Sequence, residues 1–214
     1  CNQEAPAKYW MHTNMLTVNG VRMSKTAGNG FLPSELFTGN HPMLERGYSP
    51  MTVRFFMLQS HYRNTLDFSN EALQAAEKGY KKLMESMSTL EKIQPSEQST
   101  VNINALERSF YDAMNDDFSS PVLIANLFEA VRLINSCYDK SDTINSEDLS
   151  KFKELMKSFV FDILGLTDET KNISGSEVIE GLMNLILDIR KTVRENKDWE
   201  TSDKIRDELK AAGV

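Results

Sequence analysis

The chain has 214 residues, of which 40% are hydrophobic and 26% charged, and a formal net charge of −7. This is an ordinary soluble globular composition, and no apolar stretch approaches the roughly 20 residues needed to span a bilayer. Two cysteines, Cys1 and Cys137, are too few for a disulfide framework, and neither belongs to a Cys/His cluster that could bind zinc. We therefore expect a cytoplasmic monomer with no membrane contact and no metal site in this chain.

The charge is distributed unevenly along the chain. Residues 1–70 contain six Lys or Arg and four acidic residues, which gives +2, so the remainder carries −9. All three histidines also lie in this first part. We therefore expect contacts with phosphate groups to concentrate in the first 70 residues.

The first predicted element is a strand over residues 9–18 (YWMHTNMLTV), which ends in the turn signal Asn19-Gly20. A basic loop over residues 21–30 (VRMSKTAGNG) follows directly. Lysine and serine beside small residues and glycines form a mobile cationic segment that can fold over a polyphosphate. Met-Ser-Lys-Thr is weak evidence by itself, and a polar turn with one exposed lysine is the simpler alternative.

Two helices are expected next. Residues 31–37 form a short helix with a serine or proline start, which stops near Gly39. Ser49 can cap the second helix and Pro50 can occupy its first position. Its predicted faces comprise Val53, Phe56, Met57 and Ser60 on one side, and Arg54, His61 and Arg63 toward another.

From Ser69 onward the pattern is helical almost to the end, with a break at residues 95–100. The remaining predicted starts and stops are Ser119–Pro121, a Ser146 cap, a stop at Gly165, a start at Ser174 or Ser176, and a last helix over 198–212. The predicted core positions are Leu73, Ala76, Tyr80, Leu83, Met84, Met87 and Leu90; Leu106, Phe110, Ala113 and Met114; Val122, Ala125, Phe128, Val131 and Ile134; Leu149, Phe152, Met156, Phe159 and Val160; Val178, Leu182, Leu185, Ile186, Ile189 and Val193; and Trp199, Ile205 and Leu209. The chain is therefore predicted to be mainly α, with a helical bundle.

Several of these stretches resemble a known family. Residues 9–12 and 22–26, followed by Gly28-Asn29, are similar to the region around the lysine signature loop of class I aminoacyl-tRNA synthetases. Residues 54–63, 110–118 and 198–207, in that order and spacing, resemble the cysteinyl-tRNA synthetase family, and the match covers essentially the whole chain. One departure is Arg22, where the family usually has lysine, so the cation is kept and its shape changes.

The resemblance implies a piece of a longer protein. Residues 1–66 would be the end of the catalytic region, with the signature loop and a junction helix. Residues 67–214 would be a helical bundle of the anticodon-stem-binding type, leading to a C-terminal anticodon-recognition domain. The nucleotide-binding fold and the zinc site that grips the cysteine thiolate would lie before Cys1, so zinc belongs to the parent protein and not to this chain.

The resemblance also implies roles for individual residues. Lys25 would be catalytic, stabilising charge on the phosphates of ATP bound with Mg²⁺. The rest of the ATP-binding set is Arg22 as an outer cation, Met23 as an apolar anchor, and Ser24 through hydrogen bonds. Arg54, His61 and Arg63 would contact the tRNA backbone. The structural alternatives are that His61 caps a helix end, that Arg63 pairs with Asp67, and that Arg54 is an ordinary exposed helix position.

Two further features favour a structural interpretation. Asp116 and Asp117 lie at a corner between two helices, where Asp caps or turns are expected, and are not interpreted as a catalytic pair. The spacing of Trp199 with Ile205 and Leu209 favours core packing over stacking on a base.

The function implied is that of a cysteine–tRNA ligase fragment, which we expect to be inactive alone. Its partners would be cysteine, ATP and the cognate tRNA. One alternative is the related ligase that joins activated cysteine to an amino sugar in thiol biosynthesis, although residues 198–207 speak against it. Another is a helical RNA-binding module without chemistry.

Overall fold

The computed structural model describes residues 7–169, 185–193 and 198–211. Two compact units are distinguished, residues 1–167 and residues 168–214, and each is described by itself. None of the helices in the described ranges is long and apolar enough to cross a membrane.

A small sheet opens the first unit, with strand order β2-β1-β3. Strand β1 (Leu16–Val18) pairs antiparallel with β2 (Val21–Arg22) and parallel with β3 (Leu66–Phe68). Asn19 and Gly20 both have positive φ, at 49° and 77°, as the predicted two-residue turn requires.

The strand predicted from Tyr9 was too long. Only Leu16–Val18 pair in the described sheet, because β3 supplies just three partner residues. The aromatic side chains before it, Tyr9 and Trp10, are 88% and 69% exposed. Their high β propensity was therefore not enough to make them a strand, because a strand also needs a neighbouring strand to pair with.

The two predicted helices that follow are present as α1 (Pro33–Thr38) and α2 (Pro50–Leu58). Gly39 ends α1 with a φ of 74°, and the Ser49 hydroxyl caps α2 by accepting a hydrogen bond from the Thr52 amide at 3.2 Å. The predicted buried face of α2 was partly wrong, because Met57 is 44% exposed whereas Phe55, omitted from that face, is fully buried. The Phe55 ring lies beside Tyr80 and Phe128, so neighbouring helices cover a face that periodicity alone assigned elsewhere.

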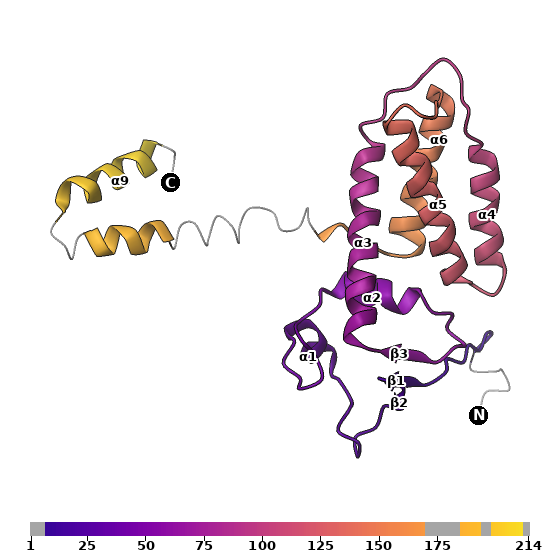
Figure 1. Ribbon diagram of the computed structural model, residues 1–214, viewed down its shortest axis with the longest axis horizontal. Helices are drawn as coiled ribbons and strands as arrows, with labels where there is room; N and C mark the ends of the chain where they lie inside the picture. The colour runs from indigo at the N-terminus through magenta and orange to yellow at the C-terminus, as the bar shows by residue number, and fades with distance from the viewer. Residues whose placement is uncertain (1–6, 170–184, 194–197, 212–214) are drawn as a thin grey trace. The chain divides into compact units, whose positions relative to one another are not determined.

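Four long helices form the rest of this unit, standing side by side beyond the sheet (Figure 1). Their bounds are α3 (Asn70–Leu90), α4 (Ile103–Asn115), α5 (Ser120–Tyr138) and α6 (Ser146–Lys157), and α6 continues as a π-helix, η1 (Ser158–Ile163). The predicted core positions of α3 and α4 are confirmed, apart from Met87 and Met114, which are half-buried. All five predicted core residues of α6 and η1 are buried, and Gly165 follows with a φ of 60°.

The buried face of α5 differs from the prediction. Val122 is 49% exposed, Ala125 is exposed and Phe128 is half-buried. The predicted core positions Val131 and Ile134 are confirmed, and the other buried residues of α5 are Leu123, Ile124, Leu127, Ala130 and Cys137. Apolar residues occupy most sides of this helix, so periodicity could not choose among its faces.

The cap of α6 is also corrected. The Asn145 side chain, one residue before Ser146, accepts the Asp148 amide at 2.8 Å. Serine and asparagine cap equally well, so residue type could not distinguish these neighbours.

In the second unit, residues 185–193 are helical and α9 spans Trp199–Ala211. Trp199, predicted to point inward, is 60% exposed, and Leu185 and Ile189 are 56% and 46% exposed. The predictions for Ser174, Ser176, Val178 and Leu182, and for the side chain of Leu209, lie outside the described residues.

Candidate functional site

The first two residues of the basic loop predicted over 21–30 form strand β2, so the loop proper follows the β1–β2 hairpin. The Met23 amide donates to the Leu16 carbonyl at 3.0 Å, which extends the hairpin one residue past β2. The Met23 side chain is half-buried and packs against the core. Met23 therefore fixes the base of the loop to the core, and its role as an apolar anchor for a closed loop stays a prediction.

Asn29 holds the loop together from inside. It is 5% exposed, and its side-chain oxygen accepts the Ser24 amide at 2.9 Å. Its side-chain nitrogen donates to the Arg22 carbonyl at 3.2 Å and lies 3.5 Å from the Val21 carbonyl oxygen. No individual role was predicted for Asn29 from the Gly28-Asn29 motif. The available signal was a polar residue between two glycines, since a polar side chain is buried only where its hydrogen-bonding groups are paired.

The two cations of the loop remain at the surface. Arg22 and Lys25 are exposed, and neither forms an ion pair with any residue that the structure describes. The Lys25 carbonyl accepts the Gly28 amide at 3.2 Å, and Gly28 has the positive φ of 64° that closes this turn. The loop therefore presents the ammonium group of an exposed lysine on a turn whose base is held by hydrogen bonds.

Asp67 fixes the hairpin from the neighbouring strand. One carboxylate oxygen accepts both the Thr17 hydroxyl at 2.6 Å and the Gly20 amide at 2.8 Å. The suggested pairing of Arg63 with Asp67 is therefore wrong. The carboxylate faces the turn between β1 and β2, which residue spacing along the chain could not reveal.

Arg63 belongs instead to a group that we call the Asp117 cluster, formed by His61, Tyr62, Arg63 and Asp117. The Asp117 carboxylate accepts the Tyr62 hydroxyl at 2.7 Å and lies 3.1 Å from Arg63 Nε. His61 Nε2 lies 3.1 Å from the Asp117 carbonyl oxygen. His61 thus lies against the corner between α4 and α5, and the structural interpretation of Asp117 as a corner residue agrees with these contacts.

Arg54, the third predicted tRNA contact, caps a helix end. Its Nε donates to the Leu164 carbonyl at 2.8 Å, just after η1, where a cation interacts favourably with the helix dipole. A side chain on Gly165 would approach the Arg54 guanidinium to 2.6 Å, so the glycine leaves room for this contact.

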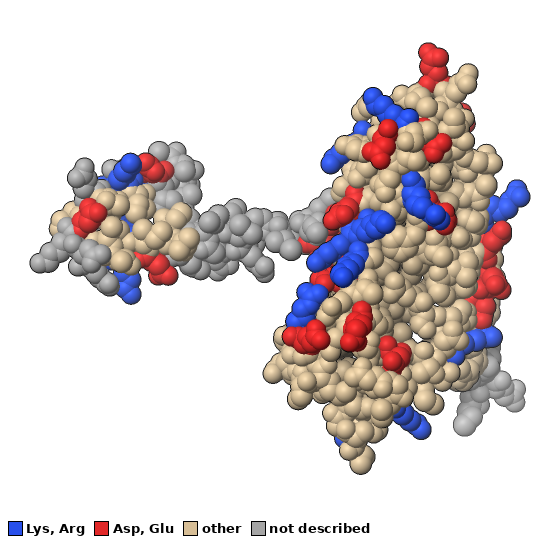
Figure 2. All heavy atoms as spheres, viewed as in Figure 1, with Lys and Arg blue, Asp and Glu red and all other residues tan. Residues whose placement is uncertain are grey.

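The predicted residues therefore fall into separate groups. Arg22, Met23, Ser24 and Lys25 share the loop, and His61 and Arg63 share the cluster. In the described part of the chain, no hydrogen bond or ion pair joins Arg22 or Lys25 directly to that cluster. Figure 2 shows Lys and Arg interspersed with Asp and Glu over the helical part of the first unit, with the sheet end largely uncharged on that face.

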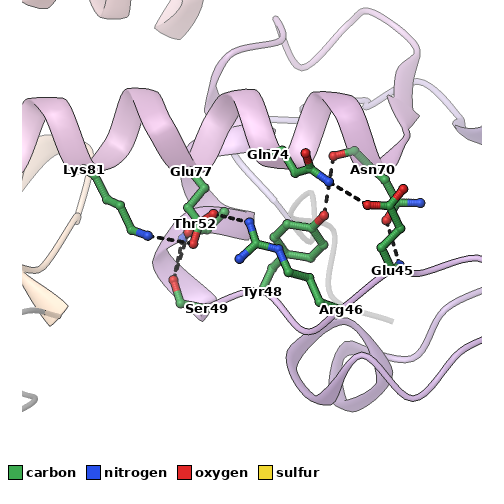
Figure 3. Close-up of polar contacts among 9 residues, drawn as sticks. All are labelled: Glu45, Arg46, Tyr48, Ser49, Thr52, Asn70, Gln74, Glu77 and Lys81. Atoms are coloured by element: carbon green, nitrogen blue, oxygen red, sulfur yellow. Dashed lines mark hydrogen bonds and ion pairs between the residues drawn. The ribbon is translucent and has the colours of Figure 1, made fainter.

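A second polar network ties α3 to the segment between α1 and α2 (Figure 3). Glu77 on α3 pairs with Arg46 and with Lys81, the latter at 3.0 Å, and the Arg46 guanidinium lies 5.1 Å from the Tyr48 ring centre. Although burial raises the pKa of the Glu77 carboxyl, hydrogen bonds from Lys81 and Arg46 outweigh it and hold that pKa below its ordinary value. The network therefore fixes the segment between α1 and α2 to helix α3.

A resident metal has no fitting donor set in this part of the molecule. Over the described ranges, no three His, Cys, Asp or Glu side chains converge in a way that could hold a metal ion. The loop offers an ammonium, a guanidinium, a hydroxyl and backbone amides, which suit an anion and not a cation.

Two family models match the chain. The model described as the class I (C) tRNA synthetase catalytic domain matches residues 1–78, and the DALR domain model matches residues 109–168. The first match contains the sheet, the loop and the cluster residues 61–63, whereas the second contains Asp117, α5 and α6. The division agrees with the predicted class of fold, a catalytic end followed by a helical domain.

Curated relatives are similar over most of the chain. A cysteine–tRNA ligase of Parabacteroides distasonis is 52% identical over 207 residues, that of Bacteroides fragilis 48% over 206, and that of Porphyromonas gingivalis 47% over 207. Each alignment covers 96% of this chain but 42% of the relative. The chain thus spans less than half the length of the curated relatives it matches.

Proposed function

Because this chain belongs to the cysteinyl-tRNA synthetase family of class I synthetases, we propose that its parent protein activates cysteine with ATP and transfers it to the 3′ end of its cognate tRNA. The chain contributes the signature loop and a helical domain. Residues 1–66 end the catalytic region, and residues 67–214 lead toward an anticodon-recognition domain. The parent acts as a cytoplasmic monomer.

The observation that carries the proposal is the exposed side chain of Lys25, on a loop whose base is fixed by Asn29. In the first step, the cysteine carboxylate attacks the α-phosphate of ATP and pyrophosphate leaves. Negative charge builds on the phosphates in that transition state. A cation that meets this charge there stabilises it by about 3 to 4 kcal/mol in comparable sites, without covalent chemistry.

The neighbours of Lys25 support the same step. Ser24 contributes its hydroxyl, which already accepts the Ala27 amide at 3.1 Å, and Arg22 supplies an outer cation. Met23 keeps the loop seated on the core while its tip closes. In the second step, the adenylate passes its acyl group to the tRNA. Arg54, His61 and Arg63 contact the backbone of this tRNA.

We propose that the zinc of the parent protein is bound by residues outside this chain. The described residues provide no donor set for it. We place the zinc that holds the cysteine thiolate in the remainder of the parent, and ATP with its Mg²⁺ at the interface of that remainder with the loop. A fragment limited to these 214 residues is then inactive by itself.

The experiment is cysteine-dependent ATP–pyrophosphate exchange and tRNA charging in the full-length parent, with wild type and Lys25→Ala. We expect both activities in the wild type and a loss of about a hundredfold or more in the variant. Asn40→Ala, at an exposed position on another loop, is the control and should retain both.

Other outcomes separate the alternatives. Exchange without charging in the wild type would favour the amino-sugar ligase. Absence of both activities would favour an RNA-binding module, and full activity of Lys25→Ala would remove the assigned role of this residue.

A further inference from the structure

The corner between α4 and α5 has an unusual backbone. Asp117 and Phe118 both have a φ of 53°, in the left-handed region that non-glycine residues seldom adopt. Such a conformation persists where surrounding contacts fix it, and these residues often lie at functional positions. Asp117 is the member of this pair with a polar side chain in contact with another part of the chain.

The contacts that fix Asp117 come from residues 61–63. The Tyr62 hydroxyl donates to one carboxylate oxygen at 2.7 Å, and Arg63 Nε lies 3.1 Å from the other. The Arg63 side chain is 66% exposed, so solvent screens this ion pair and the Tyr62 hydrogen bond is the better ordered link. His61 adds a contact to the Asp117 backbone at 3.1 Å.

The same residues also hold the segment that leads into the signature loop. The Asn14 amide donates to the Tyr62 carbonyl at 3.2 Å, and the Asn14 side chain donates to the Arg63 carbonyl at 3.1 Å. Two residues further on, the carbonyl of Leu16 accepts the Met23 amide at 3.0 Å. A short series of contacts therefore runs from the α4–α5 corner through residues 61–63 and Asn14 to the base of the loop.

We propose that Asp117 is a positioning residue that sets how helices α4 and α5 lie against the catalytic end of the chain, through its contacts with residues 61–63. Its carboxylate joins the two regions matched by different family models, residues 1–78 and 109–168. The other polar link described between these regions, from Arg54 to Leu164, ends on a backbone carbonyl and leaves this corner untouched. Residues 61–63 provide a contiguous set of hydrogen bonds through which such coupling can be carried.

The inference rests on the proposed function. Adenylate formation needs the loop, ATP and cysteine, whereas transfer also needs tRNA aligned with the adenylate by the helical domain. Loss of the Asp117 contacts therefore slows transfer and leaves adenylate formation almost intact. Because Asp117 orients another part of the protein, the effect falls on kcat for charging more than on the KM for tRNA.

The test uses the full-length parent with Asp117→Gly, since Gly adopts a positive φ readily and the whole carboxylate, the acceptor of the Tyr62 hydroxyl included, is removed. We expect kcat for charging to fall about tenfold, while exchange and the KM for tRNA stay within about twofold. Tyr62→Phe, which keeps the ring, should give the same selective pattern. The double variant should be little worse than either single variant, because both remove one link.

Asp116→Gly is the matched control, because Asp116 is the exposed neighbour of Asp117 and the enzyme with this substitution should charge tRNA normally. A parallel fall of exchange and charging in both test variants would mean a purely structural contact and would overturn the inference, as would unchanged charging. A wild-type parent without cysteine-dependent exchange would instead overturn the proposed function and the inference with it.

Discussion

The buried side-chain oxygen of Asn29 accepts the Ser24 amide at 2.9 Å, across the base of the loop that exposes Lys25. A rigid base beneath an exposed cation lets the loop tip move without losing its register on the sheet. The same side chain satisfies carbonyl groups on the opposite side of the loop. Asn29 is thus the internal support of the signature loop.

The first prediction concerns this support. Asn29→Ala leaves the Ser24 amide and the Arg22 carbonyl unpaired, which should lower the free energy of unfolding by about 1–3 kcal/mol. Exchange in the full-length parent should fall at least tenfold, because Lys25 is then less well positioned. Urea titration and exchange assays measure the two effects, and unchanged exchange would show that the loop is positioned by other contacts.

The second prediction concerns the hairpin beneath the loop. Asp67→Ala removes one acceptor shared by Thr17 and Gly20, and should destabilise the chain by about 2–3 kcal/mol. Thr17→Val should recover part of this loss in the Asp67→Ala background, because it removes a buried hydroxyl left without a partner. Strictly additive effects of the two substitutions in urea unfolding would argue against the shared acceptor.

The third prediction concerns pH. The folded-state pKa of Glu77 is lowered, so the unfolded chain binds more protons at this site as the solution is acidified. The resulting stability is present above the ordinary value of 4.5 and is lost as the pH falls through the lowered value. Unfolding titrations from pH 7 to 3 should show a shallower decline for Glu77→Gln than for wild type, and Glu85→Gln, on the exposed side of α3, should follow wild type.

The fourth prediction concerns the close approach of Gly39 and Gly47. A Cβ on Gly47 would lie 2.3 Å from the Phe37 carbonyl oxygen, and a Cβ on Gly39 would lie 2.3 Å from the Gly47 amide. Gly47→Ala should therefore cost about 3 kcal/mol, because backbone must move. Gly30→Ala is the comparison, since its Cβ would meet only Met23 Cγ at 3.8 Å, and equal losses for the two variants would contradict this account.

Much of this fold could be predicted from the sequence alone, because it depends on interactions between residues close together in the chain. Asn19-Gly20 makes its turn, Ser49 and Pro50 start α2, and the apolar stripe of α3 is buried largely as predicted. Each of these features depends on residues close together in the chain, within about one turn of a helix or one hairpin. Residue type and spacing are therefore enough to predict them. The resemblance to a family could also be read from the sequence, because the motif around Lys25 and residues 54–63, 110–118 and 198–207 are each contiguous stretches.

The tertiary structure alone decided the remainder. The partner of Arg63 is Asp117 and not Asp67, the buried side of α5 is shifted from the predicted one, and Tyr9 and Trp10 lie outside any described strand. Each depends on which distant segment lies alongside: the α4–α5 corner against residues 61–63, helices around α5, and a three-residue β3 beside β1. Residue type and periodicity fix what a side chain can do, whereas packing of segments far apart in the chain fixes which partner it meets.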